Sequence, residues 1–183
     1  YALADGNVIT ANLPWPLSSN RIREDLGFEA VHLVNDFEAV AHAAGHISAS
    51  QVLQLTGPAD AERGPTLVVG PGTGLGVAGL VHARDMWFPV PGEGGHVDVG
   101  PRSDRDFAIF PHLKRIEGRV SAEEILSGRG LVNIYRAICA ADGAEPTLKD
   151  PADVTAAGLD GSNEQAVETL SLFPTYLGRV AGD

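Results

Sequence analysis

Asn35 and Asp36 stand directly after a short apolar run, residues 30–34. We predict that this run is a buried strand, because unbroken apolar residues are typical of strands covered on both faces. A carboxylate at the C-terminal tip of such a strand lies where α/β proteins bind ligands. There Asp36 can accept a proton from a hydroxyl group that attacks phosphorus, and Asn35 can bind further hydroxyls. From the dipeptide alone, Asp36 as the cap of a helix over residues 37–44 is the more common arrangement, and one residue can serve both purposes.

Four glycines alternate with other residues in the segment Gly70-Pro-Gly-Thr-Gly-Leu-Gly76. Gly70, Gly72 and Gly74 allow backbone N–H groups to turn inward around an anion, and Thr73 adds a hydroxyl donor. The flanking residues are apolar and typical of strands, which predicts a hairpin. A plain tight hairpin is the alternative, but so many glycines cost folding entropy, so we favour a phosphate-binding loop.

Residues 74–79 also match the G-x-G-x-x-G pattern of dinucleotide-binding folds. That pattern requires a helix to begin at the loop. Residues 77–82 are typical of a strand instead, so we reject a dinucleotide site.

Glu93 and His96 lie in a second glycine-rich loop, residues 91–100, which also carries Asp98. A carboxylate beside an imidazole is suited to binding the hydroxyls of a small polar ligand. A flexible surface turn explains the pattern equally well. A metal site is disfavoured, because no cysteine or second histidine lies nearby.

Glu123 is the third acidic candidate. Ser121 and Glu124 have the spacing of a capping box, which predicts a helix that begins there and ends at residues 127–128. Glu123 then has no capping duty. It is either a ligand-binding group or a first-turn carboxylate that the helix dipole favours.

The elements that must position these residues are mostly short. A hairpin or strand is expected within residues 1–12, and strands over 66–69, 77–82 and 86–90. Caps, stops and periodicity predict helices over residues 18–27, 37–44, 48–55, 104–116 with a break at Pro111, 130–141, from 151, and 164–178. Strands with loops first and helices later predict an α/β fold, a sheet flanked by helices.

Composition excludes several classes of function. The net charge of the 183 residues is −11, which disfavours a nucleic-acid partner. The single cysteine, Cys139, cannot form an internal disulfide or a multi-cysteine zinc site, and its apolar neighbours predict a buried helix residue. No apolar run approaches the roughly 20 residues that span a bilayer, so no membrane partner is expected and the cytoplasm is the default location.

The motifs together resemble the bacterial glucokinase family, of the zinc-free type, within the actin-like sugar kinase superfamily. The resembling segments occur in the family's order and spacing: residues 33–40, 69–77, 91–98, 120–128 and 130–137. The Cys-rich segment that a related, zinc-binding group carries before the position of Glu123 is missing.

The resemblance implies an actin-like ATPase (ribonuclease H-like) fold, with residues 1–30 in a small lobe and 31–183 in a large lobe. It implies that Asp36 is the catalytic base and that the sugar is bound by Asn35, Glu93, His96 and Glu123. The loop with Gly70, Gly72, Thr73 and Gly74 is then one of two phosphate-binding hairpins. The family's other phosphate loop and its adenosine-binding segment lie outside these residues, so the site for ATP with Mg²⁺ is expected to be incomplete here.

The expected activity is ATP-dependent phosphorylation of D-glucose to glucose 6-phosphate, with a homodimer as a possible assembly. A kinase for another hexose is the first alternative, because the sequence does not show the shape of the sugar pocket. A non-catalytic sugar-binding regulator is the second, although no basic DNA-binding segment is visible. A fragment that is inactive by itself is the third.

Overall fold

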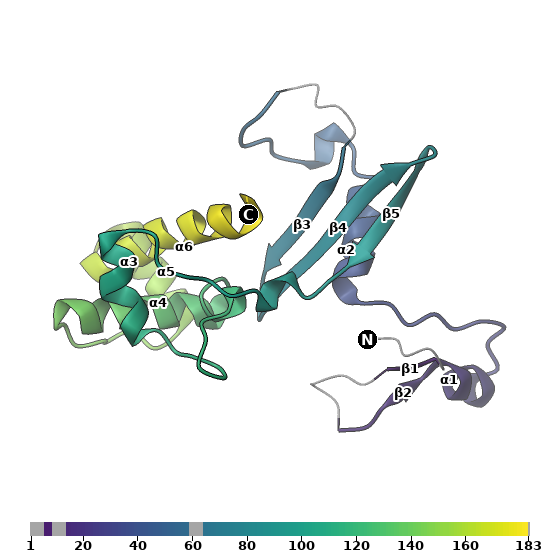
Figure 1. Ribbon diagram of the computed structural model, residues 1–183, viewed down its shortest axis with the longest axis horizontal. Helices are drawn as coiled ribbons and strands as arrows, with labels where there is room; N and C mark the ends of the chain where they lie inside the picture. Colours follow the sequence, from purple (N-terminus) through teal and green to yellow (C-terminus); the bar gives the residue numbers. More distant parts are fainter. Residues whose placement is uncertain (1–5, 9–13, 59–63, 183) are drawn as a thin grey trace. The chain divides into compact units, whose positions relative to one another are not determined.

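The computed structural model describes residues 6–8, 14–58 and 64–182 (Figure 1). The chain divides into two compact units. The first unit contains Tyr1–Thr66 and Gly79–Pro91, and the second contains Leu67–Ala78 and Gly92–Asp183. The lobe boundary expected after residue 30 stays a prediction.

The first unit begins with two short strands and a helix. Strand β1, Asn7–Val8, pairs in antiparallel fashion with β2, Leu17–Ser18. Helix α1, Ser19–Leu26, begins where the Ser18 side chain accepts a hydrogen bond from the Arg21 N–H, and Gly27 ends it in the left-handed conformation. The predicted helix over residues 18–27 is confirmed. Most of the hairpin expected within residues 1–12 lies outside the described residues, and its described part includes β1.

Two predictions for the first unit are wrong. Residues 30–34 are not a buried strand: they form no β-bridge, and Val34 is 58% exposed. A strand needs a neighbouring strand for its N–H and C=O groups, and none within the described residues pairs with this run. In place of a helix over residues 48–55 there is a single 3₁₀ turn, Ala49–Gln51. Leu53 and Leu55 are both more than 80% exposed, so no apolar face holds a helix there.

Helix α2, Asp36–Ala44, packs against strand β5, Met86–Pro91. Ala41 on this helix is fully buried. Gly45 ends the helix, and a methyl group at this position would lie 2.9 Å from Cγ of Trp87 on β5. The helix end and the strand therefore approach more closely than any larger residue would allow.

Three strands form the main sheet in the order β3-β4-β5 (Figure 1). Strand β3 covers Thr66–Pro71 and β4 covers Leu75–Ala83. The glycine loop connects β3 to β4, which confirms the predicted hairpin. Arg84 and Asp85, both with positive φ, make the turn into β5. The three strands were predicted from their apolar runs, and the structure shows that β3 is partly exposed.

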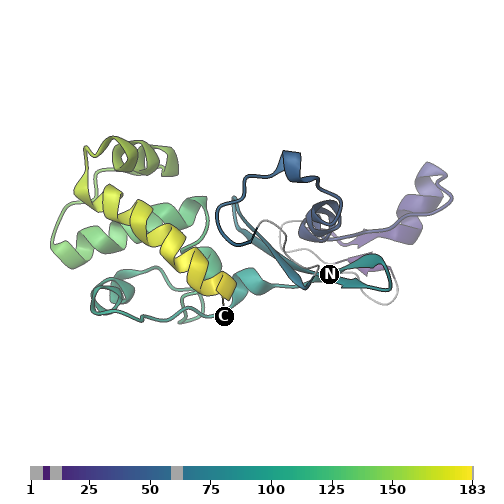
Figure 2. The ribbon, with the colours of Figure 1, turned by 90° about the horizontal axis from the view of Figure 1, so that it is seen from above.

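Helices make up most of the second unit and gather in one bundle (Figure 2). Helix α6 packs along α4 and α5, and α3 contacts α4. The helices are α3 (Asp104–Ile109), α4 (Gly128–Asp142), α5 (Pro151–Asp160) and α6 (Glu164–Gly182). The break predicted at Pro111 is confirmed, because α3 gives way to a 3₁₀ turn, Phe110–His112. The predicted continuation of the helix to residue 116 is wrong, because residues 113–116 are not helical. Cys139 is buried in α4 as expected, and burial raises the pKa of its thiol.

The helix predicted to begin at Ser121 is wrong. Ala122–Glu124 forms one 3₁₀ turn, and the Ser121 side chain makes no capping bond. The backbone of Ser121 instead pairs with Asp98, and the buried Glu124 carboxylate lies 3.2 Å from Arg129. Both members of the expected capping box therefore interact with residues other than each other.

A buried carboxylate joins the first and last helices of this bundle. Asp106 on α3 is fully buried and accepts hydrogen bonds from the Tyr176 hydroxyl at 3.0 Å and from Arg179 at 2.6 Å, both on α6. The backbone N–H groups of Arg102 and Ser103 also donate to it. Burial acts to raise the pKa of Asp106, but these donors hold it below its ordinary value. Among the described residues, no helix is both long enough and apolar enough to cross a membrane.

Candidate functional site

The glycine loop is fixed by its own backbone and by helix α4. The Gly72 N–H donates to the carbonyl of Gly74 at 2.8 Å, and the Gly128 N–H at the start of α4 donates to the carbonyl of Gly72 at 2.8 Å. The Gly72 N–H is therefore used within the turn and does not point at a ligand. Thr73 makes no hydrogen bond to any residue that the structure describes, so its N–H and hydroxyl are the donors at the tip of the loop.

Glu123 lies directly beside this loop. Its Oε2 accepts a hydrogen bond from the Leu75 N–H at 3.0 Å, and its Oε1 pairs with Nη2 of Arg129. The side chain is 18% exposed. A carboxylate has about four lone-pair sites, so Glu123 can still accept hydrogen bonds from ligand hydroxyls. A methyl group added at Gly74 would lie 3.0 Å from Cδ of Glu123, so a larger residue there would displace this carboxylate.

Arg129 is a site residue that sequence reasoning missed. It lies in the first turn of α4, where no acidic residue is present and where the helix dipole disfavours a cation. It is held there by Glu123 and by Glu124, whose Oε1 lies 3.2 Å away. A basic residue in the first turn of a helix, a few residues after two glutamates, is the signal that was available.

Glu93 and His96 lie together in the second glycine-rich loop. Oε2 of Glu93 and Nδ1 of His96 are 3.0 Å apart, and both side chains are about half exposed, 52% and 55%. The loop forms a 3₁₀ turn, Gly94–His96, against the start of β4. Gly95 packs on the carbonyl oxygen of Leu75, a contact that leaves no space for a Cβ atom.

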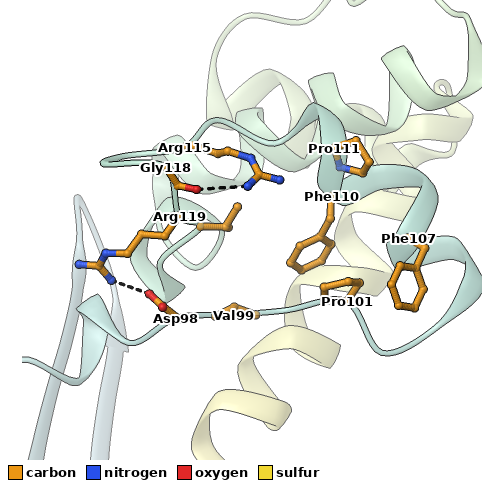
Figure 3. A pocket seen from close by; sticks show the side chains of 10 residues that line it. Asp98, Val99, Pro101, Phe107, Phe110, Pro111, Arg115, Gly118 and Arg119 are labelled. Carbon is orange, nitrogen blue, oxygen red and sulfur yellow. Dashed lines mark hydrogen bonds and ion pairs between the residues drawn. The ribbon is translucent and has the colours of Figure 1, made fainter.

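Hydrogen bonds attach this loop to the segment that leads to Glu123. The Val99 N–H donates to the Val120 carbonyl and the Ala122 N–H donates to the Val97 carbonyl, both at 2.9 Å. Arg119 adds bonds to the Asp98 carboxylate at 2.7 Å, visible in Figure 3, and to a backbone carbonyl of the loop at 2.6 Å. The two 3₁₀ turns that carry His96 and Glu123 consequently lie in contact.

The second unit thus brings together the glycine loop, Glu93, His96 and Glu123. The arrangement places carboxylate and imidazole groups, which bind hydroxyls, beside a turn with free donors for an anion. Among the described residues, no group of three or more His, Cys, Asp or Glu side chains is arranged to hold a metal ion.

Asn35 and Asp36 belong to the first unit. Asn35 is the N-cap of α2, and its Oδ1 accepts a hydrogen bond from the Phe37 N–H at 2.8 Å. The suggestion that Asp36 is the cap is therefore wrong, although its Oδ1 also lies 2.9 Å from the same N–H. Asp36 is the first residue of α2 and is exposed, so one of its oxygens is available to other groups. The packing of α2 on β5 fixes its position within this unit.

Comparison with solved structures identifies the fold. Glucokinase from an Antarctic psychrotroph superposes with a TM-score of 0.82 at 30% identity, covering 99% of this chain and 56% of that one. Glucokinase from Balamuthia mandrillaris in complex with glucose gives a TM-score of 0.79 at 25% identity, over 99% of this chain and 57% of that one. The expected α/β, actin-like sugar kinase fold is confirmed.

Sequence comparison identifies the family. The family profile described as Glucokinase matches residues 2–183. The chain is 57% identical over 180 residues to a glucokinase of Brucella suis and 58% identical over 182 residues to one of Rhizobium etli. Both alignments cover 98% of this chain and 52% of the relative, so the chain spans about half the length of the curated relatives it matches. The chain belongs to the glucokinase family.

Proposed function

We propose that this protein catalyses the transfer of the γ-phosphoryl group of ATP to the 6-hydroxyl of D-glucose. The observation that carries the proposal is the position of Glu123. One carboxylate is bonded to the backbone of the glycine hairpin, at Leu75, and lies in contact with the turn that carries His96. A group that binds sugar hydroxyls and a loop that binds phosphate are thus held in one rigid arrangement, as phosphoryl transfer to a sugar requires.

The sugar is bound by Asn35, Glu93, His96 and Glu123. Glu93 and His96 act as a pair, because their side chains already lie within hydrogen-bond distance of each other. Glu123 is oriented by the Leu75 N–H and by Arg129, which fix both oxygens before any ligand arrives. Fixed groups of this kind lose little conformational entropy on binding.

Asp36 accepts the proton of the attacking hydroxyl. Asn35, as the helix cap, leaves Asp36 without a required capping role. Asp36 is exposed at the first residue of α2, so one oxygen of its carboxylate is available to accept the proton of a bound hydroxyl.

The loop of Gly70, Gly72, Thr73 and Gly74 binds the transferring phosphate. Its free donors include the N–H and hydroxyl of Thr73, whereas the Gly72 N–H is used within the turn. Mg²⁺ that arrives with ATP would supply neutralisation of the charge on the phosphates. Loop N–H groups that are already oriented stabilise negative charge without reorganisation.

The test is a coupled assay for ATP-dependent phosphorylation of glucose, with mannose and fructose at the same concentration. The proposal predicts turnover with a clear preference for glucose. A preference for mannose or fructose would keep the mechanism and replace the substrate. Glucose binding without turnover on any sugar would favour a sugar-binding regulator.

Assembly and location are further parts of the proposal. The family resemblance suggests a homodimer, and the cytoplasm stays the expected location. Light scattering on the purified protein measures its mass in solution, and cell fractionation measures its location. A monomeric mass or a membrane-bound fraction would contradict these two points.

A further inference from the structure

A hollow of about 590 Å³ lies on the second unit beside Glu124. One wall is a single face of α4, because Arg129, Asn133 and Arg136 are spaced i, i+4 and i+7. The other walls are formed by Lys114, Lys149 and Pro151. The volume is in the range of sites that hold small molecules.

The lining is cationic in a chain that is strongly acidic overall. Lys114 and Lys149 are the only lysines of the sequence, and both line the hollow. Arg129 and Arg136 add two more positive charges, against a single carboxylate, while the net charge of the chain is −11. A concave surface lined by one sign of charge concentrates ligands of the opposite sign.

Two of these cations have no partner in the part of the chain that the structure describes. Arg136 and Lys149 form no ion pair or hydrogen bond through their side chains with the residues that the structure describes. Lys114 lies 3.7 Å from the Glu124 carboxylate. The guanidinium of Arg136 offers a planar set of donors that matches a phosphate group, and Lys149 offers a second charge.

Glu124 provides the second recognition feature. Its side chain is only 2% exposed, and its Oε1 lies 3.2 Å from Nη2 of Arg129 but accepts no well-aligned hydrogen bond within the described part of the chain. A buried acceptor whose ion-pair partner is poorly aligned gains from a further donor, and a ligand hydroxyl would supply one. The occupant should therefore carry both a phosphate group and hydroxyl groups.

We propose that this hollow binds a small hydroxylated phosphate monoester. The phosphate lies between Arg136 and Lys149, and a hydroxyl donates to Oε1 of Glu124. The lining of the hollow includes neither the loop of Thr73 nor the residues assigned to the sugar, but Arg129 in the lining contacts Glu123.

Occupancy has a consequence for the sugar site, and this consequence rests on the proposed function. Arg129 contacts Glu124 in the hollow and Glu123 in the sugar site. An anion that attracts Arg129 weakens its pairing with Glu123. Binding in the hollow is therefore expected to raise the KM for glucose, which would make the site inhibitory.

The binding test uses glycerol 3-phosphate, which is a hydroxylated phosphate monoester without a sugar ring. Isothermal titration of the intact protein, without nucleotide, is expected to show one site. Arg136→Gln should weaken binding about tenfold and Arg136→Gln with Lys149→Gln about 100-fold, since each loses a charge-assisted bond. Both side chains are exposed, so the unfolding midpoint should stay within about 2 °C of the parent.

The control is Arg23→Gln, which removes the same charge from an exposed position of α1 in the first unit. It should leave glycerol 3-phosphate binding unchanged. Equal weakening by Arg23→Gln, or parental affinity in the double variant, would overturn the proposal. So would no binding of glycerol 3-phosphate by the parent.

Glucose 6-phosphate, inorganic phosphate and ATP distinguish the source of the ligand. If glucose 6-phosphate shares the site, its affinity should fall in the double variant as that of glycerol 3-phosphate does. Inorganic phosphate lacks the carbon-bound hydroxyls and should bind to the parent more weakly than glycerol 3-phosphate. Loss of ATP affinity alone, with both monoesters unaffected, would make the hollow part of the donor site and refute the proposal. The KM for glucose with and without glycerol 3-phosphate is a separate arm, so failure of the proposed activity would leave the binding result intact.

Discussion

Replacement of Gly74 by alanine tests whether the position of Glu123 controls sugar binding. The added methyl group would lie 3.0 Å from Cδ of Glu123 and closer still to Oε2. Carbon atoms in contact prefer 3.5 to 4.0 Å, so the carboxylate must move by about 0.5 to 1 Å. The hydrogen bond from the Leu75 N–H, now 3.0 Å, would then exceed the normal range.

Gly74→Ala should weaken glucose binding more than it lowers the stability of the fold. A carboxylate at the end of a flexible side chain can move away, so the unfolding midpoint should change little. A misplaced Glu123 weakens the bonds to the sugar, and a hydrogen bond to a charged group is worth about 1.5 to 3 kcal/mol. We therefore expect Gly74→Ala to weaken glucose binding by about 10- to 100-fold.

Gly72→Ala is the matched control in the same loop. A methyl group added at Gly72 would have no heavy atom of another residue within 4 Å, its chain neighbours aside. The φ angle of Gly72 is not in the left-handed region. Titration calorimetry with glucose, without ATP, should give parental affinity for Gly72→Ala. Parental affinity for Gly74→Ala as well, with lost affinity for Glu123→Gln, would show that the spacing argument is wrong. Parental glucose affinity for Gly74→Ala and for Glu123→Gln would remove Glu123 from the sugar site.

Three further predictions concern the surroundings of the site. Gly45→Ala should lower the free energy of unfolding by about 1 to 3 kcal/mol, because its methyl group would lie 2.9 Å from Trp87. Urea unfolding measures this change. An unchanged midpoint would contradict the close packing of α2 on β5. Asp106→Asn should lower the free energy of unfolding at neutral pH and make that free energy depend less on pH in the acid range. The pKa of this carboxyl is lowered in the folded state, so its contribution is present above the ordinary value of 3.8 and is lost as the pH falls below it. Unfolding at a series of pH values from 6 to about 3 tests this, and parallel curves for parent and variant would refute it. Arg119→Gln should raise the KM for glucose several-fold with little change in kcat, because it loosens the loop of His96; a fall in kcat alone would contradict that role.

Local signals predicted local structure well. Helix α1 begins at Ser18 and ends at Gly27 as expected, since a cap and a left-handed glycine act within one turn of the chain. The three strands of the main sheet followed from apolar runs, and the burial of Cys139 followed from its apolar neighbours.

The errors arose where structure depends on distant residues. Residues 30–34 have the composition of a strand, but composition does not supply a neighbouring strand. Ser121 and Glu124 have the spacing of a capping box, yet their partners are Asp98, 23 positions before Ser121, and the arginine at 129. Glu93, His96 and Glu123 were chosen as candidates from residue type. Their convergence on the glycine loop depends on backbone bonds between segments that no spacing rule predicts.

Asp36→Asn tests the central claim most directly. The claim is that this chain belongs to an enzyme that phosphorylates glucose from ATP with Asp36 as the base. The parent should phosphorylate glucose, while Asp36→Asn should lose about 10²- to 10⁴-fold in kcat and keep its glucose affinity, because an amide still binds hydroxyls but cannot accept the proton. Near-parental turnover by Asp36→Asn would contradict the account.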